Sequence, residues 1–257
     1  MNQIIVALIF AGGLFVGMIL LLELGRRLGR RRQGRDEEGA RAGLGAVEGA
    51  VFTLLGLLIA FTFSGAASRF DMRRQLIGQE ANAIGTAWLR LDLLPAQAQP
   101  ELRDLFRRYL DLRLAAYRKM PDVEAALAEL SQANALQGEI WHRAVAACQE
   151  APNPLQTQLI PALNEMFDLA ATRMVVARIH PPPIIFALLG VLALMSSLLA
   201  GYAMAGGKAR SWIHVIGFAL ITATTVYVIL DLEFPRLGII QVEAFDRVLV
   251  DLRQSMH

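Results

Sequence analysis

The sequence predicts an all-α membrane protein, and two features of the chain support that prediction. Four uncharged, apolar stretches occupy residues 2–22, 49–68, 184–204 and 211–230. Each is long enough to cross a bilayer, because about 20 helical residues at about 1.5 Å per residue match a hydrocarbon core of roughly 30 Å. The long segment between the second and third stretches shows helical apolar periodicity and no sustained alternation typical of strands.

The composition indicates that the chain is shared between membrane and water. Of 257 residues, 55% are hydrophobic, which is too apolar for a soluble domain, yet 19% are charged, which is too many for a fully embedded chain. We therefore expect a helical extramembrane domain inserted between spans two and three. The predicted regions are two membrane helices with an arginine-rich cytoplasmic loop (1–68), a helical aqueous domain (69–183), two membrane helices (184–231) and a C-terminal amphipathic helix (232–257).

Arginines determine the predicted orientation. Seven of them lie in the loop between residues 24 and 45, and loops rich in Lys and Arg remain in the cytoplasm. Both termini and the 69–183 domain are then predicted to lie outside the cytoplasm, although four arginines beside that domain oppose this asymmetry. The loop arginines are Arg26, Arg27, Arg30, Arg31, Arg32, Arg35 and Arg41, and the opposing ones are Arg69, Arg73, Arg74 and Arg178.

The same arginine cluster would suggest a nucleic-acid surface in a soluble protein. Directly after a membrane span it is typical of a topology signal, so we expect the lipid bilayer as a partner and no nucleic acid. The first span has no positive charge before it, unlike a cleaved signal peptide, and we expect it to be retained.

The second span is predicted to continue into the aqueous domain as one helix. No residue between positions 49 and 94 forces a break, and apolar residues beyond the membrane recur at steps of four, three, four and three. Such a stripe must be buried, and we expect a homo-oligomer in which these helices gather around the symmetry axis. The stripe consists of Ile77, Ala81, Ile84, Trp88 and Leu91.

Three further helices and a terminal one complete the expected elements. The second aqueous helix covers 101–119, the third runs from Pro121 in its first turn to Cys148, and the fourth covers 155–179 with Pro161 as a kink. Pro181, Pro182 and Pro183 predict a rigid break before the third span. Apolar residues from Ile239 to Leu252 share one face of the last amphipathic helix.

Small residues on one face of the second span are the clearest functional indication. Thr53, Gly56, Ala60 and Ser64 recur at helical spacing, while larger apolar residues occupy the rest of the helix. Two interpretations remain open. The face either packs closely against another helix, because small residues let backbones approach, or lines a pore built from several copies. These four residues are the candidate pore-lining residues.

Charges near the membrane are candidates for pore mouths. In a symmetric ring each charge would be repeated, which gives collars that concentrate or select ions. The alternative is simple anchoring at the interface. The candidate pore-mouth residues are Glu48, Arg69, Arg73, Arg74, Asp231 and Glu233.

The sequence gives little support for enzyme chemistry. Its four histidines are dispersed, its single cysteine excludes a cysteine zinc cage, and no metalloprotease, serine-hydrolase or phosphate-cradling motif occurs. We expect no catalytic, cofactor-binding or metal site, and no cofactor.

Four tracts resemble the bacterial bestrophin-like domain family. They are GLLIAFTFS (56–64), RFDMRRQLIGQEANAIGTAWLRLDLLP (69–95), RRYLDLRLAAY (107–117) and DLEFPRLGIIQV (231–242). The resemblance implies a four-span helical protein of the bacterial inner membrane, similar in layout to bestrophins, which are pentameric ion channels with a pore lined by their second span. Bestrophins keep the inserted domain in the cytoplasm, whereas the arginine loop here predicts the outside.

Two functions from different classes therefore remain open. In the first, the chain is a homo-oligomeric ion channel around the second span, with inorganic ions as partners. In the second, it is a non-conducting structural or signalling membrane protein whose helical domain binds a partner. The first requires a continuous polar path through the membrane, and the second requires a binding patch on the aqueous domain.

Overall fold

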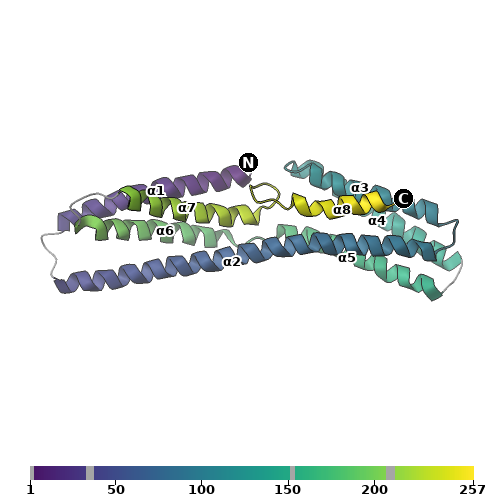
Figure 1. Ribbon diagram of the computed structural model, residues 1–257, viewed down its shortest axis with the longest axis horizontal. Coiled ribbons are helices and arrows are strands. Elements are labelled where there is room, and N and C mark those ends of the chain that lie inside the picture. The colour runs from purple at the N-terminus through teal and green to yellow at the C-terminus, as the bar shows by residue number, and fades with distance from the viewer. Residues whose placement is uncertain (1–2, 33–37, 151–153, 207–211) are drawn as a thin grey trace. The chain divides into compact units, whose positions relative to one another are not determined.

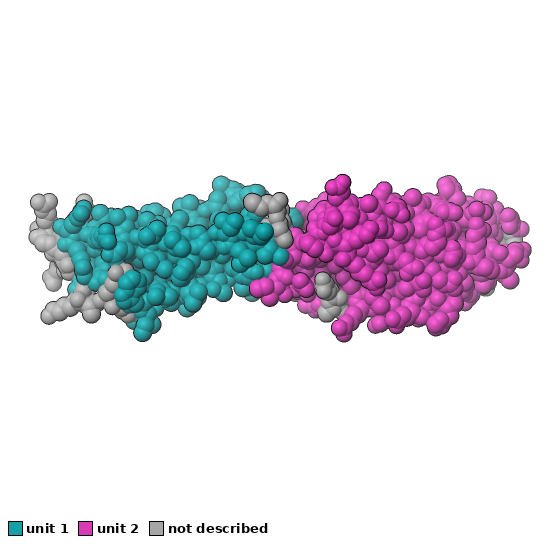
Figure 2. Space-filling model, turned by 90° about the horizontal axis from the view of Figure 1, so that it is seen from above, with its two compact units in different colours: residues 1–69, 180–234 teal, residues 70–179, 235–257 magenta. Residues whose placement is uncertain are grey.

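The structure is a computed structural model that describes residues 3–32, 38–150, 154–206 and 212–257 (Figure 1). Within these ranges every regular element is a helix, which confirms the all-α class. Four helical stretches are long and apolar enough to cross a membrane, as predicted. The chain divides into two compact units, coloured separately in Figure 2: Met1–Arg69 with His180–Phe234, and Phe70–Ile179 with Pro235–His257. We call them the membrane unit and the second unit.

The membrane unit contains α1 (Gln3–Arg32), α6 (Pro183–Ala203), α7 (Trp212–Glu233) and the first part of α2 (Glu38–Arg90). Helix α1 packs along both α6 and α7 (Figure 1). A short 3-10 turn, η3 (Met204–Gly206), follows α6 and also contacts α1.

Glycines set the distance between α1 and α6. A Cβ atom added to Gly201 of α6 would lie 2.0 Å from the Leu22 carbonyl oxygen, and one added to Gly25 of α1 would lie 2.0 Å from the Leu198 carbonyl oxygen. Both approaches are to backbone atoms that cannot swing aside. The two helices therefore meet backbone to backbone, which is how small residues associate membrane helices.

The second unit is a helical bundle around one apolar core. It contains the rest of α2, the 3-10 turns η1 (Leu91–Leu93) and η2 (Pro154–Gln158), and four further helices. These four are α3 (Gln99–Arg118), α4 (Val123–Glu150), α5 (Leu159–Arg178) and α8 (Glu243–Ser255).

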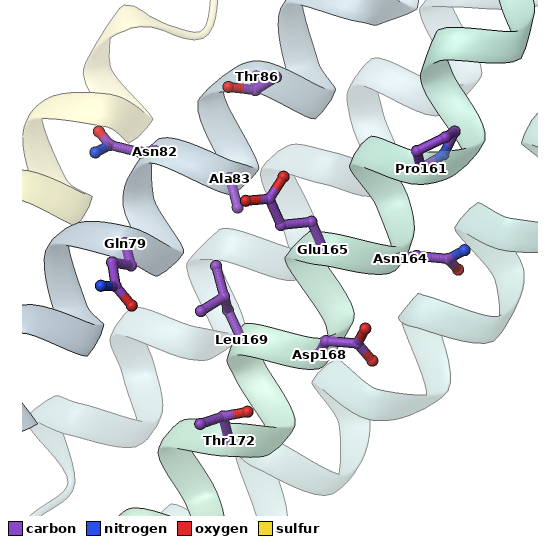
Figure 3. A pocket seen from close by; sticks show the side chains of 10 residues that line it. All are labelled: Gln79, Asn82, Ala83, Thr86, Pro161, Asn164, Glu165, Asp168, Leu169 and Thr172. Atoms are coloured by element: carbon purple, nitrogen blue, oxygen red, sulfur yellow. The ribbon is translucent and has the colours of Figure 1, made fainter.

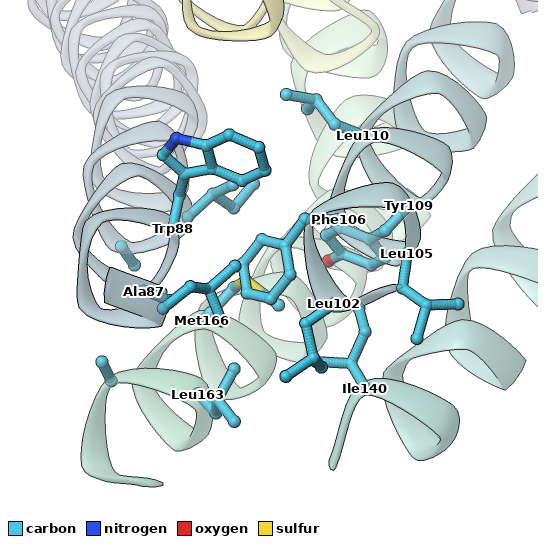
Figure 4. Packing of buried hydrophobic residues seen from close by; sticks show 14 of the residues in the cluster. Ala87, Trp88, Leu102, Leu105, Phe106, Tyr109, Leu110, Ile140, Leu163 and Met166 are labelled. Carbon is cyan, nitrogen blue, oxygen red and sulfur yellow. The ribbon is translucent and has the colours of Figure 1, made fainter. Parts of the chain in front are cut away.

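The predicted apolar stripe of α2 lies in this core. Trp88 of α2 packs near Phe106 of α3, with ring centroids 6.2 Å apart, and Leu163 and Met166 of α5 line the same cluster (Figure 4). All five stripe residues are buried. Helix α2 is one continuous helix to Arg90, which confirms the prediction that the second apolar stretch continues without a break into the helix that carries the stripe.

Three local predictions need correction. The 24–45 segment, expected as a loop, is helical up to Arg32 and again from Glu38, because arginine is a good helix former, and residues 33–37 lie outside the described residues. Helix α4 begins at Val123 rather than at Pro121, and Asp122 caps it by accepting a hydrogen bond from the Ala125 N–H (3.0 Å).

Pro161 does not kink α5, contrary to expectation. It is the third residue of that helix, since a 3-10 turn precedes Leu159. In the first turn a backbone N–H has no partner within the helix, so proline removes nothing there. The break before the third span is present, because α5 ends at Arg178 and α6 begins at Pro183.

Candidate functional site

The small-residue face of α2 is uncovered in the single chain. Thr53, Gly56, Ala60 and Ser64 are all exposed. The Thr53 hydroxyl donates to the Gly49 carbonyl oxygen one turn earlier (2.8 Å), so it is satisfied by its own helix. The four residues form a narrow, weakly polar strip rather than a row of free hydrogen-bonding groups.

The glycines in the first part of α2 differ from Gly25 of α1 and Gly201 of α6 in having no neighbour from another helix. A Cβ atom added to Gly45, Gly49 or Gly56 would find no atom of another helix within 4 Å. Within the described chain, the small face of α2 therefore does not serve close helix packing. Of the two interpretations in the sequence, packing inside one chain is not what these residues do.

Larger apolar residues flank the strip, and their exposure defines which side of α2 is covered. Leu55 is only 4% exposed, and Phe52 meets Phe218 of α7 edge-on with ring centroids 5.9 Å apart. On the other side, Leu57 and Phe61 are 50% and 67% exposed. Helix α2 thus presents one side to the membrane unit and leaves a broad apolar side, including the small strip, open.

An ion pair connects the C-terminal end of the second apolar span to the C-terminal end of the fourth. Arg69 donates from Nε to both carboxylate oxygens of Glu233, at 2.9 and 3.2 Å, and from Nη2 to one of them. The Glu233 side chain is 1% exposed. His180 lies beside the same carboxylate, with Nδ1 3.6 Å from Oε2, and stacks on Phe234 at 4.7 Å between ring centroids.

The remaining candidate charges have separate environments. Nη2 of Arg73 donates to the Ile179 carbonyl oxygen (2.9 Å), and Arg74 pairs with Asp71 (3.1 Å) and lies over the Phe245 ring. Asp231 is 4% exposed and accepts a hydrogen bond from the Tyr227 hydroxyl. Glu48 is half-buried.

The six candidate charges therefore do not form one group. Arg69 and Glu233 are the pair that the structure brings together, whereas Glu48 lies near the opposite end of the second span. Arg69, Arg73, Asp231 and Glu233 all have a partner within the chain. Arg74 also has one, the Asp71 carboxylate.

A polar groove in the second unit was not anticipated from the sequence. It has a cavity volume of about 660 Å³ and lies between α2 and α5 (Figure 3). Amide, hydroxyl and carboxylate side chains dominate its walls. The lining residues are Gln79, Asn82, Ala83, Thr86, Pro161, Asn164, Glu165, Asp168, Leu169 and Thr172. The available signal was the helical spacing of Gln79, Asn82 and Thr86 beside the apolar stripe.

A buried charge cluster was also missed. Glu80 of α2 is fully buried and pairs with Arg113 of α3 and Arg173 of α5. The Tyr117 ring lies against both guanidinium groups, at 5.7 and 4.7 Å from its centroid, and against that of Arg236 at 4.4 Å. Burial raises the pKa of the Tyr117 hydroxyl. The cluster joins three helices of the second unit through one carboxylate.

The sequence could not reveal this cluster, because a glutamate in a helix is usually solvated. The available signal was its position three residues after Ile77 and four before Ile84, on the face of the apolar stripe. In the part of the chain that the structure describes, no group of three or more His, Cys, Asp or Glu side chains could hold a metal ion.

Comparisons with known proteins identify solved structures with a similar fold. A crystal structure of a variant of a bacterial bestrophin homologue from Klebsiella pneumoniae matches with a TM-score of 0.66 and 15% identity, over 94% of this chain and 97% of that one. Another structure of a bestrophin homologue from the same organism matches with a TM-score of 0.63 and 16% identity, over 93% and 98%. At these identities the likeness concerns the fold. No curated protein matches.

The family comparison is more direct. The model of the Bestrophin-like domain matches residues 12–244, which is most of the chain, and confirms the resemblance seen in the sequence tracts. Together with the four apolar helices, it identifies a membrane protein. The chain belongs to the Bestrophin-like domain family.

Proposed function

We propose that the chain assembles into a homo-oligomeric ion channel in which the small face of α2 lines the conduit. The main support is that Thr53, Gly56, Ala60 and Ser64 are exposed on one helix face that no other described part of the chain covers. Around a symmetry axis, small residues leave room for an ion path where larger ones would close it.

The apolar stripe of α2 gives no support for an oligomer. We expected Ile77 to Leu91 to be buried by other copies, but the chain's own α3 and α5 bury them in the second unit. Support comes instead from the membrane unit, where the open side of α2 combines small residues with exposed Leu57 and Phe61. A repeated α2 would cover this side at a helix–helix contact.

The charges at the ends of the second and fourth spans are proposed as pore-mouth groups that differ in how strongly they would act on ions. Glu48, Arg69 and Arg74 are the three of the six that are not buried, and because Arg69 pairs with Glu233, Glu48 and Arg74 are the ones whose charge would act on ions. Arg69 and Glu233 largely neutralise each other, so their proposed contribution is to hold the two helix ends together.

The second unit is proposed as a helical domain in water on the outer side of a bacterial inner membrane, with both termini on that side. Its apolar core and its polar groove suit an aqueous domain. Thiol labelling in intact cells tests the orientation. With Cys148→Ala as background, cysteines at exposed positions Gln97 and Gln254 should react with a membrane-impermeant reagent. Labelling of both only after lysis would place the domain in the cytoplasm.

The alternative function is a non-conducting membrane protein whose second unit binds a partner. The groove between α2 and α5 is the observation that favours it, because it offers amides, hydroxyls and two carboxylates to a ligand or a protein segment. In that case the small face of α2 would contact another copy or lipid without enclosing a path.

An ion-flux assay distinguishes the two. The purified chain reconstituted in liposomes should release ions, and Ala60→Phe should reduce the flux at least tenfold, because one ring per subunit is added at a single level of the pore. Ile221→Phe is the matched control, since Ile221 is 69% exposed on α7 and not on the proposed pore-lining helix, and this variant should conduct normally. Absence of flux from the unmodified chain under every gradient, pH and calcium level tried would contradict the channel proposal.

A further inference from the structure

The inner end of α1 carries a one-sided arginine surface. Arg26, Arg27, Arg30 and Arg31 occupy the last two turns of this helix, directly after its apolar stretch. Arg27, Arg30 and Arg31 are exposed and Arg26 is half-buried. We call these four residues the arginine face.

Packing fixes the direction in which the arginine face points. Gly25 and Gly29, one turn apart, press against α6 and η3: an added Cβ would lie 2.0 Å from the Leu198 carbonyl oxygen and 2.5 Å from the Ala205 side chain. At about 100° per residue, Arg26, Arg30, Arg27 and Arg31 fall between about 100° and 240° from Gly25. The arginines therefore occupy the side of α1 opposite its packed glycines.

Little negative charge offsets these arginines in the described part of α1. Glu23 pairs with Arg27 through an exposed i, i+4 contact of 3.1 Å, and the Arg27 side chain remains 72% exposed. Such a pair in solvent is weak. From Gly25 to Arg32 the sequence contains no acidic residue.

We propose that the arginine face binds the phosphate groups of anionic phospholipid headgroups. The face begins about one helical turn beyond the predicted end of the first span, which puts guanidinium groups at headgroup level. A guanidinium group binds a phosphate through two parallel hydrogen bonds, whereas an ammonium group acts only as a point charge.

Lipid binding by the arginine face does not depend on ion conduction, and it requires more than an orientation signal does. Positive charge alone would set orientation wherever it lies around the helix. The glycine contacts instead hold the arginines on the side of α1 that faces away from α6 and η3. In a single chain, lipid is the available neighbour on that side. A fixed multivalent surface selects anionic lipid from a mixed bilayer.

The test measures lipid preference around the full chain. The protein is reconstituted in nanodiscs of phosphatidylcholine with a small fraction of spin-labelled phosphatidylglycerol or spin-labelled phosphatidylcholine, and the immobilised fraction of each label gives their relative association constant. We expect phosphatidylglycerol to be preferred. The triple variant Arg27→Gln, Arg30→Gln, Arg31→Gln should lower this preference roughly fivefold or more, because it removes three surface cations that attract anionic headgroups.

A matched control separates this surface from net charge. Arg108, Arg118 and Arg247 are exposed in the second unit, and their replacement by Gln removes the same charge elsewhere. The control should keep the preference of the unmodified chain. The triple variant retains Arg26, Arg32, Arg35 and Arg41, so the orientation signal persists.

If the triple variant is poorly produced, lipid preference can be tested on the unmodified chain and on a lysine variant. In the unmodified chain, 0.5 M salt should weaken the preference, and 10 mM inorganic phosphate at constant ionic strength should not displace the lipid. Replacement of Arg27, Arg30 and Arg31 by Lys should retain part of the preference. Equal association of both lipids with the unmodified chain, or equal loss in the triple variant and the control, would overturn the proposal.

Discussion

The membrane unit and the second unit bury their interiors in different ways. In the membrane unit, α1 and α6 meet through glycines whose neighbours are backbone atoms, and large apolar side chains such as Ile213 and Ile184 point outward at 84% and 71% exposure. In the second unit, large side chains such as Phe106 and Tyr109 are fully buried in one cluster.

The difference follows from the solvent that each unit is suited to. Lipid tails are as apolar as leucine, so a membrane bundle gains little from turning large apolar residues inward and depends on close backbone contact instead. In water the burial of apolar area drives folding at about 25 cal/mol per Å². The second unit has a continuous core of this kind, whereas in the membrane unit fewer large apolar side chains, among them Met18 and Leu22, are buried.

Both units bury an ion-paired carboxylate. Glu80 is nearly inaccessible in the second unit and pairs with Arg113 and Arg173, whereas Glu233 in the membrane unit pairs with the more exposed Arg69. Removing one member of a buried ion pair leaves the others uncompensated, which costs far more than breaking an exposed pair. Stability of the second unit should therefore depend strongly on the Glu80 carboxylate.

The largest expected effect is from Glu80→Ala. It leaves the Arg113 and Arg173 guanidinium groups without their buried partner, and should destabilise the chain by about 3–5 kcal/mol. Asp92→Ala is the control, because the Asp92 side chain is 60% exposed where it pairs with Arg103, and should cost about 0–1 kcal/mol. Thermal unfolding in detergent measures both. Similar small shifts for the two variants would show that the Glu80 cluster is not held as a buried network.

The next effect tests backbone contact in the membrane unit. Gly201→Ala places a Cβ atom 2.0 Å from the Leu22 carbonyl oxygen, and should destabilise the unit by about 1–3 kcal/mol as α1 and α6 separate. Gly56→Ala, at a site with no neighbour within 4 Å, should be neutral or stabilising by up to about 1 kcal/mol. Cysteine crosslinking between α1 and α6 would report the separation. Unchanged crosslinking and melting in Gly201→Ala would rule out tight contact there.

The smallest effect concerns alkaline pH. Burial raises the pKa of Tyr109 to about 12, against about 10 in an unfolded chain. A raised folded pKa gives stability that is complete below pH 10 and is lost as pH rises towards 12. At pH 11 the loss should be about 1.4 kcal/mol, and Tyr109→Phe should remove that part of the pH dependence. Absorbance titration of the tyrosines gives the pKa directly, and a Tyr109 that titrates near 10 would contradict the assignment.

Part of this architecture was readable from the sequence. Helical length, apolar spans and the spacing of Ile77, Ala81, Ile84, Trp88 and Leu91 predict the four apolar helices, the long α2 and its buried stripe, because periodicity and span length depend on local geometry. The small face of α2 was also visible as a pattern. Its proposed lining of a pore stays a prediction.

Only the tertiary structure decided which partners those patterns meet. The stripe of α2 is covered by the chain's own α3 and α5 rather than by a second copy, and the glycines closest to a neighbouring backbone include Gly25 and Gly201 but not Gly56. Spacing along one helix states which residues share a face, but it does not state what that face contacts. Spacing along α2 likewise could not show that Glu80 is buried between Arg113 and Arg173, because its counter-charges come from residues 33 and 93 positions away.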